Sequence, residues 1–201
     1  MMSGSRRIMH YVRLGQIAYA PALTFQQMCA KAVMSGKSQP NGADGVLLVL
    51  EHDPVYTVGL RSDRYPDNVA DDLRRLGADF QRTNRGGLIT FHGPGQLVVY
   101  PILHLRHWGL GVKSYVEALE HAIIRACGAV GVYGERSAKY TGVWIGRNKI
   151  AAIGGLLKFL PRDAMLARYM PSAFVCVSVT LRYCIKMAKQ RITQKRYMIA
   201  Q

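Results

Sequence analysis

The densest group of residues suited to chemistry in this 201-residue chain lies between Arg85 and Gln96. Four glycines in this segment leave space where a ligand or another backbone comes close. Around them stand Arg85, a fixed cation, His92, a ring that titrates near neutral pH, and Gln96, an amide. Two glycine pairs flank a short apolar strand, which favours a narrow tunnel for an extended acyl chain. The alternative is two tight turns around an ordinary strand, with His92 a hydrogen-bonded core residue.

A second candidate is Lys149, which ends the segment Gly146–Lys149 between two apolar runs, Tyr140–Ile145 and Ile150–Ile153. Two strand-like runs joined by such a turn predict a β-hairpin. A lysine at the end of a hairpin can be partly desolvated, and desolvation lets it act as a base. The alternative is an ordinary solvated turn lysine.

Several common binding motifs are excluded. No Gly-Lys-Ser/Thr follows the glycines, so the segment is not a P-loop, and it does not match Gly-x-Gly-x-x-Gly. The histidines nearest to His92, His104 and His107, fit no zinc spacing and have no cysteine partner. We therefore expect neither a metal nor an organic cofactor.

The elements that must position these residues can be predicted from hydrophobic periodicity and turn signals. Strands and helices alternate without a regular strand–helix–strand rhythm, which predicts an α/β (α+β) fold with a mixed sheet flanked by helices. Ser114–Glu117 matches a helix capping box, with Ser114 as the N-cap. The predicted helices are Pro21–Met34, Asp67–Leu76 and the run after Ser114 to Gly128. Lys37–Gly45 is a predicted loop. The predicted strands are Tyr11–Leu14, Gly45–Leu50, Ala78–Thr83, Leu88–Phe91, Leu97–Leu103, Tyr140–Ile145, Ile150–Ile153 and Ala173–Leu181.

Three segments together carry a family resemblance. Arg85–Gln96, followed by Leu97–Leu103 with its Tyr-Pro pair, resembles the signature of lipoyl(octanoyl) transferases. Tyr140–Ile145 with Lys149–Gly154 resembles the lysine motif of that family, in the same order and at a similar separation. The earlier segment His52–Gly59 is similar to its first substrate-facing loop. The resemblance extends from about Tyr11 to Gly154.

The resemblance implies a fold shared with biotin and lipoate ligases, and a mechanism. In this family a cysteine thiolate takes an octanoyl group from octanoyl-acyl carrier protein, and a lysine of a lipoyl domain then takes it from the cysteine. The lipoyl domains belong to 2-oxoacid dehydrogenases and the glycine cleavage H protein. The motif match implies that Lys149 is the catalytic lysine, which favours the thiolate and shuttles protons. It also implies a substrate pocket lined by Arg85, Gly86, Gly87, Leu88, Ile89, Thr90, Phe91, His92, Ala152, Ile153 and Gly154.

The resemblance ends after Gly154. The family continues with a His-Gly-Leu segment and a Pro-Cys-Gly that carries the nucleophile, and neither is present here. Cys176 and Cys184 lie in this region without flanking proline or glycine. We therefore expect a basic N-terminus (1–10), a C-terminally incomplete transferase domain (11–154) and an unrelated basic tail (155–201). A chain of this kind is expected to have little or no transferase activity.

The net charge and the cysteine positions limit the partners and the compartment that can be expected. The net charge is +15, but residues 1–154 carry only +7, which suits an acidic protein partner, and the remaining +8 lies beyond residue 154. No binding motif accompanies the basic tail, so nucleic acid is not the expected partner. No apolar run is long enough to span a membrane. The four cysteines are far apart and favour a reducing compartment, and the acid-free start up to Asp44 favours import into mitochondria over a cytoplasmic location.

Two alternative functions stay open at this stage. One is an ATP-dependent lipoate or biotin ligase, which shares the fold, uses a lysine and is distinguished by adenylate formation. The other is a truncated, non-catalytic protein that binds acyl carrier protein or lipoyl domains without turnover.

Overall fold

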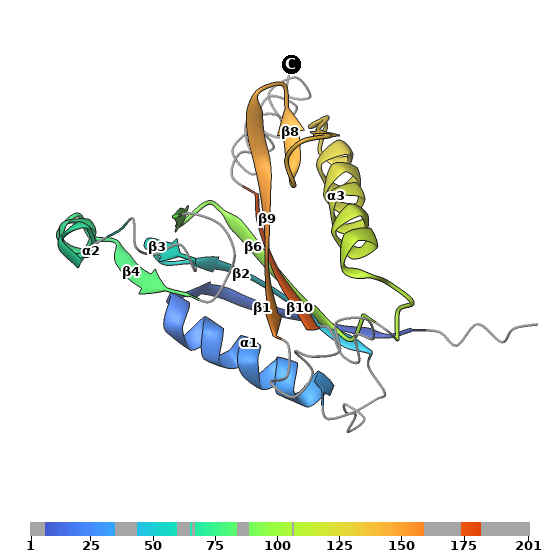
Figure 1. Ribbon diagram of the computed structural model, residues 1–201, viewed down its shortest axis with the longest axis horizontal. Helices are drawn as coiled ribbons and strands as arrows, with labels where there is room; N and C mark the ends of the chain where they lie inside the picture. The colour runs from blue at the N-terminus through green and yellow to red at the C-terminus, as the bar shows by residue number, and fades with distance from the viewer. Residues whose placement is uncertain are drawn as a thin grey trace, which may run out of the picture.

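The computed structural model describes residues 7–34, 44–59, 65, 67–83, 89–105, 107–158 and 174–181. These residues form three helices and ten strands (Figure 1). The helices are α1 (Tyr19–Met34), α2 (Asp67–Arg75) and α3 (Val112–Ala129). The strands are β1 (Met9–Ile17), β2 (Gly45–His52), β3 (Val55–Val58), β4 (Asp79–Arg82), β5 (Thr90–His92), β6 (Leu97–Leu103), β7 (Glu135–Arg136), β8 (Val143–Ile145), β9 (Asn148–Lys158) and β10 (Phe174–Leu181).

Seven of the strands form one mixed sheet in the order β1-β2-β6-β10-β9-β8-β7. β1 and β2 run parallel, and all the other neighbours in this sheet are antiparallel. β2 is almost continuously apolar because it pairs on both sides and is covered on both faces. The fold class predicted from the sequence, a mixed sheet flanked by helices, is confirmed.

The two faces of this sheet are covered by different helices (Figure 1). On the face that we call the α1 face, Ala22 of α1 packs with Leu48 and Leu50 of β2 and with Val98 and Tyr100 of β6. On the opposite face, the α3 face, Ile123 and Cys127 of α3 pack with buried residues of the β8–β9 hairpin. Alternate residues of each strand therefore enter different cores.

A smaller sheet, in the order β4-β3-β5, lies beside the large one and carries α2 (Figure 1). β3 pairs with β4 in parallel and with β5 in antiparallel register. Phe80 and Val58 pack under Ala70 of α2. The helix ends before Gly77, whose φ of 83° is in the left-handed region that favours glycine.

Most predicted elements are present with shifted ends. α1 begins two residues before the predicted Pro21, which occupies the first helical turn, where proline is tolerated. The predicted loop Lys37–Gly45 lies mostly outside the described residues. None of the described helices is long and apolar enough to cross a membrane.

The predicted capping box at Ser114 is wrong. The N-cap of α3 is Gly111, so Ser114 is the third helical residue. The Ser114 hydroxyl accepts a hydrogen bond from the Gly111 amide and donates one to the Gly111 carbonyl, both at 3.0 Å. Serine and threonine hydroxyls bond locally to either side, so the residue type alone did not fix the helix start.

The predicted strand Ala173–Leu181 is confirmed as β10, and its place in the sheet is central. β10 pairs with β6 through Val179–Leu181 and with β9 through its whole length. β9 itself runs to Lys158, four residues past Gly154. The backbone of the large sheet therefore includes residues on both sides of the predicted domain boundary, and the boundary itself stays a prediction.

Candidate functional site

The predicted site residues come from two parts of the fold. Thr90, Phe91 and His92 form β5 in the small sheet, directly after Ile89, and Lys149 to Gly154 lie in β9 of the large sheet. Arg85, Gly86, Gly87 and Leu88 lie outside the described residues.

His92 is buried where the two sheets meet. Only 4% of its surface is exposed. Its Nε2 lies 3.4 Å from the Thr57 hydroxyl, and that hydroxyl can donate its proton to the Thr90 carbonyl. This contact joins β5 to β3 with either ring tautomer, because the hydroxyl and the ring nitrogen can each donate or accept. The His92 ring also lies edge-on to His52, with the ring centroids 5.8 Å apart.

His52, at the end of β2, links this junction to the large sheet. Its Nδ1 lies 3.1 Å from the Ile17 carbonyl, which can only accept, so Nδ1 donates. Its Nε2 then accepts the Tyr100 hydroxyl proton at 2.9 Å. Burial lowers the pKa of His52 below its usual 6.5, although the Ile17 carbonyl and Asp53 act in the opposite direction. The neutral ring thus has a structural role on the α1 face, where it joins β2 to β1 and β6.

The segment His52–Gly59, which the sequence marks as a substrate-facing loop, is mostly strand. Val55–Val58 form β3, and Thr57 is fully buried. Tyr56 packs against Phe91 with their ring centroids 4.9 Å apart. This segment supplies the support beneath β5.

The strand register places the β9 motif level with β6, the strand that follows the glycine-rich motif, with β10 between them. Thr180 of β10 pairs with Val98 on one side and with Ala152 on the other. Paired residues share a face, so Ala152 lies on the α1 face with Val98. Gly154 lies two residues further along the same strand and shares this face. Ile153 lies on the other face, where it packs against the α3 core.

A β-bulge sets the side of the sheet on which Lys149 lies. Val143 pairs with Ala151, but the next residue, Trp144, pairs with Lys149 rather than Ile150. Ile150 is the extra residue, and it is buried in the α3 core next to Ala151. Trp144 follows Val143 of that core and so lies on the α1 face, together with its partner Lys149. The bulge re-aims the lysine onto the face that carries Ala152 and Gly154.

Trp144 and Gly142 form the immediate surroundings of Lys149. The side chain is exposed, and its Nζ lies 4.7 Å from the centroid of the Trp144 ring, a cation–π contact. Gly142 has a φ of 120°, and a Cβ built on it would lie 3.4 Å from Cε of Lys149. The missing side chain leaves room for the lysine stem.

Gly142 is held in turn by Glu120 of α3. The buried carboxylate of Glu120 accepts the Gly142 amide proton at 2.8 Å and a proton from Nε of Arg136 at 2.6 Å. This hydrogen bond raises the pKa of Arg136. The sequence reasoning did not select Trp144, Gly142 or Glu120 as positioning residues. The available signal was a glycine two residues before the tryptophan that pairs with the lysine.

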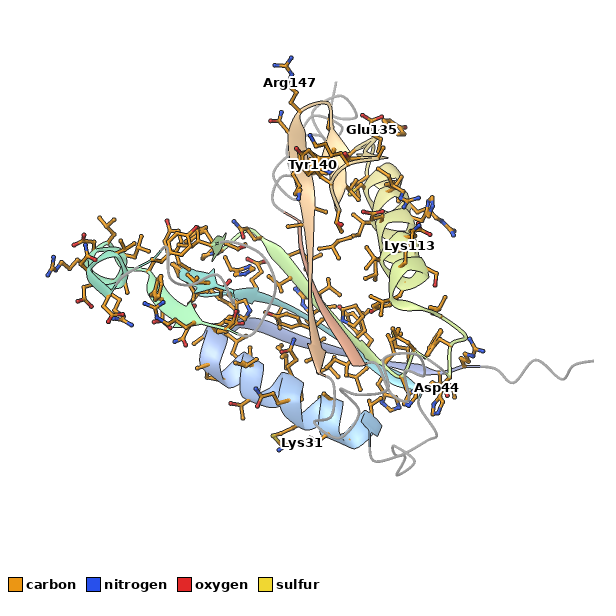
Figure 2. The ribbon with its side chains drawn as sticks, in the orientation of Figure 1. Lys31, Asp44, Lys113, Glu135, Tyr140 and Arg147 are labelled. Carbon is orange, nitrogen blue, oxygen red and sulfur yellow. The ribbon has the colours of Figure 1, made fainter. Side chains whose placement is uncertain are left out.

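A separate cleft of about 700 Å3 lies between the start of α3 and residues 136–141. None of the predicted site residues lines it. Its charged groups Arg136, Glu117 and Glu120 pair with one another. Figure 2 shows Lys113 on the α3 side of this region and Tyr140 on the hairpin side, with Arg147 at the tip of the hairpin.

The two cysteines whose side chains are described lie in helices α1 and α3. Cys29 belongs to α1 and packs against the α1 core, where burial raises the pKa of its thiol. Cys127 is buried in the α3 core, on the opposite face from Lys149. Apolar packing of this kind does not favour the thiolate that an activated nucleophile requires.

Comparison with solved structures defines the fold class. The chain is similar to lipoate-protein ligase A in the structure with bound ATP, with a TM-score of 0.59 and 14% identity over 87% of this chain and 66% of that one. It is also similar to the bipartite lipoate protein ligase of Thermoplasma acidophilum, with a TM-score of 0.57 and 14% identity over 92% of this chain and 72% of that one. At this identity the likeness shows the fold of the lipoate ligases.

Sequence comparison narrows this class to a family. Residues 18–159 match the lipoyl protein ligase A/B catalytic domain, and the chain belongs to this family. It is 53% identical to the mitochondrial octanoyl-acyl-carrier-protein:protein N-octanoyltransferase LIPT2 of Xenopus tropicalis, over 71% of this chain and 59% of that protein. It is 49% identical to an octanoyltransferase of Solibacter usitatus, over 71% of this chain and 63% of that protein. The chain is thus a homologue of octanoyltransferases and spans about three fifths of the length of these relatives.

Proposed function

We propose that this chain binds octanoyl thioesters of acyl carrier protein and the acceptor lysine of lipoyl domains, as a member of the octanoyltransferase branch of its family. The observation that carries the proposal is the common face of Lys149, Ala152 and Gly154, which is also the face of Tyr100 and His52. A cation beside small residues suits a thioester, because Ala152 and Gly154 leave room for an acyl chain and Lys149 can stabilise developing negative charge.

The chemistry follows from the thioester. An attacking amine forms a C–N bond at the carbonyl carbon, the C–S bond breaks, and the sulfur leaves as a thiolate that is protonated. The amine must lose a proton in the same process. Lys149 is suited to stabilise the anionic oxygen or the leaving thiolate in its charged form and to relay a proton in its neutral form. In the family a cysteine of the enzyme accepts the acyl group first, as the resemblance implies.

We propose that this chain transfers the octanoyl group slowly or not at all. Cys127 lies in the core of the face opposite Lys149, Cys29 packs from α1 into the apolar α1 core, and the Pro-Cys-Gly of the family is absent from the sequence. The chain then acts mainly as a binding protein for its two partners. Its expected partners are octanoyl-acyl carrier protein and the lipoyl domains of 2-oxoacid dehydrogenases and of the glycine cleavage H protein, and its expected location is the mitochondrion.

The test is incubation with octanoyl-acyl carrier protein, followed by intact-mass measurement and by a binding titration of the same samples. We expect binding without a stable octanoyl adduct, and we expect the charge-reversal variant Lys149→Glu to weaken the binding. An adduct that maps to Cys176 or Cys184 would overturn the proposal of slow transfer. A complete lack of binding would overturn the proposed function.

A further inference from the structure

The side chain of Gln96 has a buried oxygen that is not used within the described part of the chain. The residue is 6% exposed, and its Oε1 has no hydrogen-bond partner among the described residues. Most buried acceptors in proteins are paired, so an unpaired one needs an explanation. One explanation is a ligand that donates a hydrogen bond to this oxygen, and the position of Gln96 on the sheet supports this explanation.

The backbone around Gln96 is held firmly. The Gln96 amide donates to the Gly93 carbonyl at 3.1 Å, which closes the turn. The Gly95 amide donates to a carboxylate oxygen of Glu51 at 2.7 Å, and Gly95 has a φ of 83°. The side chain therefore starts from a fixed position at the beginning of β6.

The register places Gln96 level with the bulge that orients Lys149. Leu181 of β10 pairs with Leu97 on one side and with Ala151 on the other, so Leu97 and Ala151 are level. Gln96 stands one residue before Leu97, and the bulge stands one position before Ala151. One strand, β10, lies between the two sites, so they are roughly 10 Å apart across the sheet.

Gln96 and Lys149 also lie on the same face. Leu97, the first residue of β6, packs against the α3 core, so strand alternation continued back by one residue directs Gln96 toward the opposite side, which is the α1 face. The register thus directs a neutral acceptor and a cation toward the same face of the sheet.

We infer that Oε1 of Gln96 accepts a hydrogen bond from the amide N–H of the arm that carries the thioester. This inference rests on the proposed function. In an acyl-pantetheine thioester, two carbons separate the sulfur from the nearest amide nitrogen. A thioester held between the Lys149 and Gln96 side chains would direct that N–H toward Gln96. A neutral carbonyl suits a neutral amide, because a buried ammonium ion facing only this acceptor would lose too much hydration.

The experiment compares two probes that differ in this N–H alone. One is S-octanoyl-N-acetylcysteamine, and the other is its ester counterpart, in which oxygen replaces the amide nitrogen. Dissociation constants are measured by ligand-observed NMR titration with the full chain, with Gln96→Met and with Gln81→Met. Gln81 lies in β4, where its amide donates to Asp79, and it serves as the matched glutamine control.

We expect the wild-type chain to bind the amide probe about fivefold more tightly than the ester, the contribution of one net hydrogen bond. Gln96→Met should bind both probes with the affinity of the ester, and Gln81→Met should keep the wild-type preference. Equal affinities in the wild-type chain, a comparison that needs no variant, would overturn the role of Gln96 alone. Failure of the wild-type chain to bind either probe would overturn the proposed function as well.

Discussion

At the scale of single residues, the candidate site depends on buried polar side chains that support it. His52 is the central example, because its neutral ring joins β2 to Tyr100 and also contacts His92. An unfolded histidine titrates near 6.5, and burial lowers the pKa of His52 in the folded chain. Between the two values the unfolded state binds more protons, so stability is lost as the pH falls below 6.5.

We therefore predict that the free energy of unfolding of the wild-type chain decreases between about pH 7.5 and about pH 5.5. The variant His52→Gln should be less stable at the higher pH and should show a smaller decrease. Urea unfolding at the two pH values measures this, with His121→Gln, which removes an exposed histidine from α3, as the comparison. A decrease in His52→Gln as large as that of the wild type would contradict the assignment.

Gly142 gives a second prediction at this scale. Its φ of 120° is strained for any other residue, and a Cβ would collide with the carbonyl oxygen of Ala151. Gly142→Ala should lower the free energy of unfolding by about 2 kcal/mol. Gly128→Ala is the control, because no atom lies within 4 Å of its Cβ position in α3, and it should stabilise the chain by about 0.5 kcal/mol. Equal effects in denaturant unfolding would show that Gly142 is not constrained.

At the scale of elements, the hairpin β8–β9 shows what the sequence can and cannot predict. The turn before Lys149 and the flanking apolar runs predict the hairpin, and it is present. The bulge at Ile150 was not predictable, because three successive residues, Lys149, Ile150 and Ala151, carry no mark of which one is unpaired. The face of Lys149 depends on that choice, so the sequence pattern identified the residue without its orientation.

The bulge predicts which glutamate substitutions along β9 the fold tolerates. Ile150 and Ala151 are both buried on the α3 face, 2% and 0% exposed, so Ile150→Glu and Ala151→Glu should each prevent cooperative folding. Lys149→Glu, one residue earlier, should change the free energy of unfolding by no more than about 0.5 kcal/mol. Urea unfolding followed by circular dichroism measures all three. A tolerated glutamate at Ile150 or Ala151 would indicate regular alternation without a bulge.

At the scale of the whole molecule, β10 completes the sheet between the strands of the two motifs. Its strand character was predictable from its alternating valines, but its partners were not, because pairing over long sequence distances leaves no local signal. The fold class could be predicted because the periodicities are clear. The position of the β9 motif relative to β5 could not be predicted, because it depends on strand register and on how the two sheets meet.

A proline in β10 tests its central position. Thr180 pairs with Val98 and Ala152, so its backbone lies between two strands. Thr180→Pro removes an N–H from a central strand and should lower the free energy of unfolding by about 3 kcal/mol or more. Thr180→Val keeps the N–H and should stay close to the wild type. A proline variant as stable as the valine variant in urea would mean that β10 does not contribute to the sheet.

The central claim is that the face shared by Lys149, Ala152 and Gly154 holds the octanoyl thioester. The most direct measurement uses octanoyl-pantetheine with a photoreactive diazirine at the end of the acyl chain, followed by mass-spectrometric mapping of the crosslinked residues. We expect crosslinks to the α1 face, at Ala152 or Gly154, and their loss on competition with unlabelled octanoyl-pantetheine. Crosslinks confined to α3 and the α3 face, around Ile123 and Ile153, would contradict it.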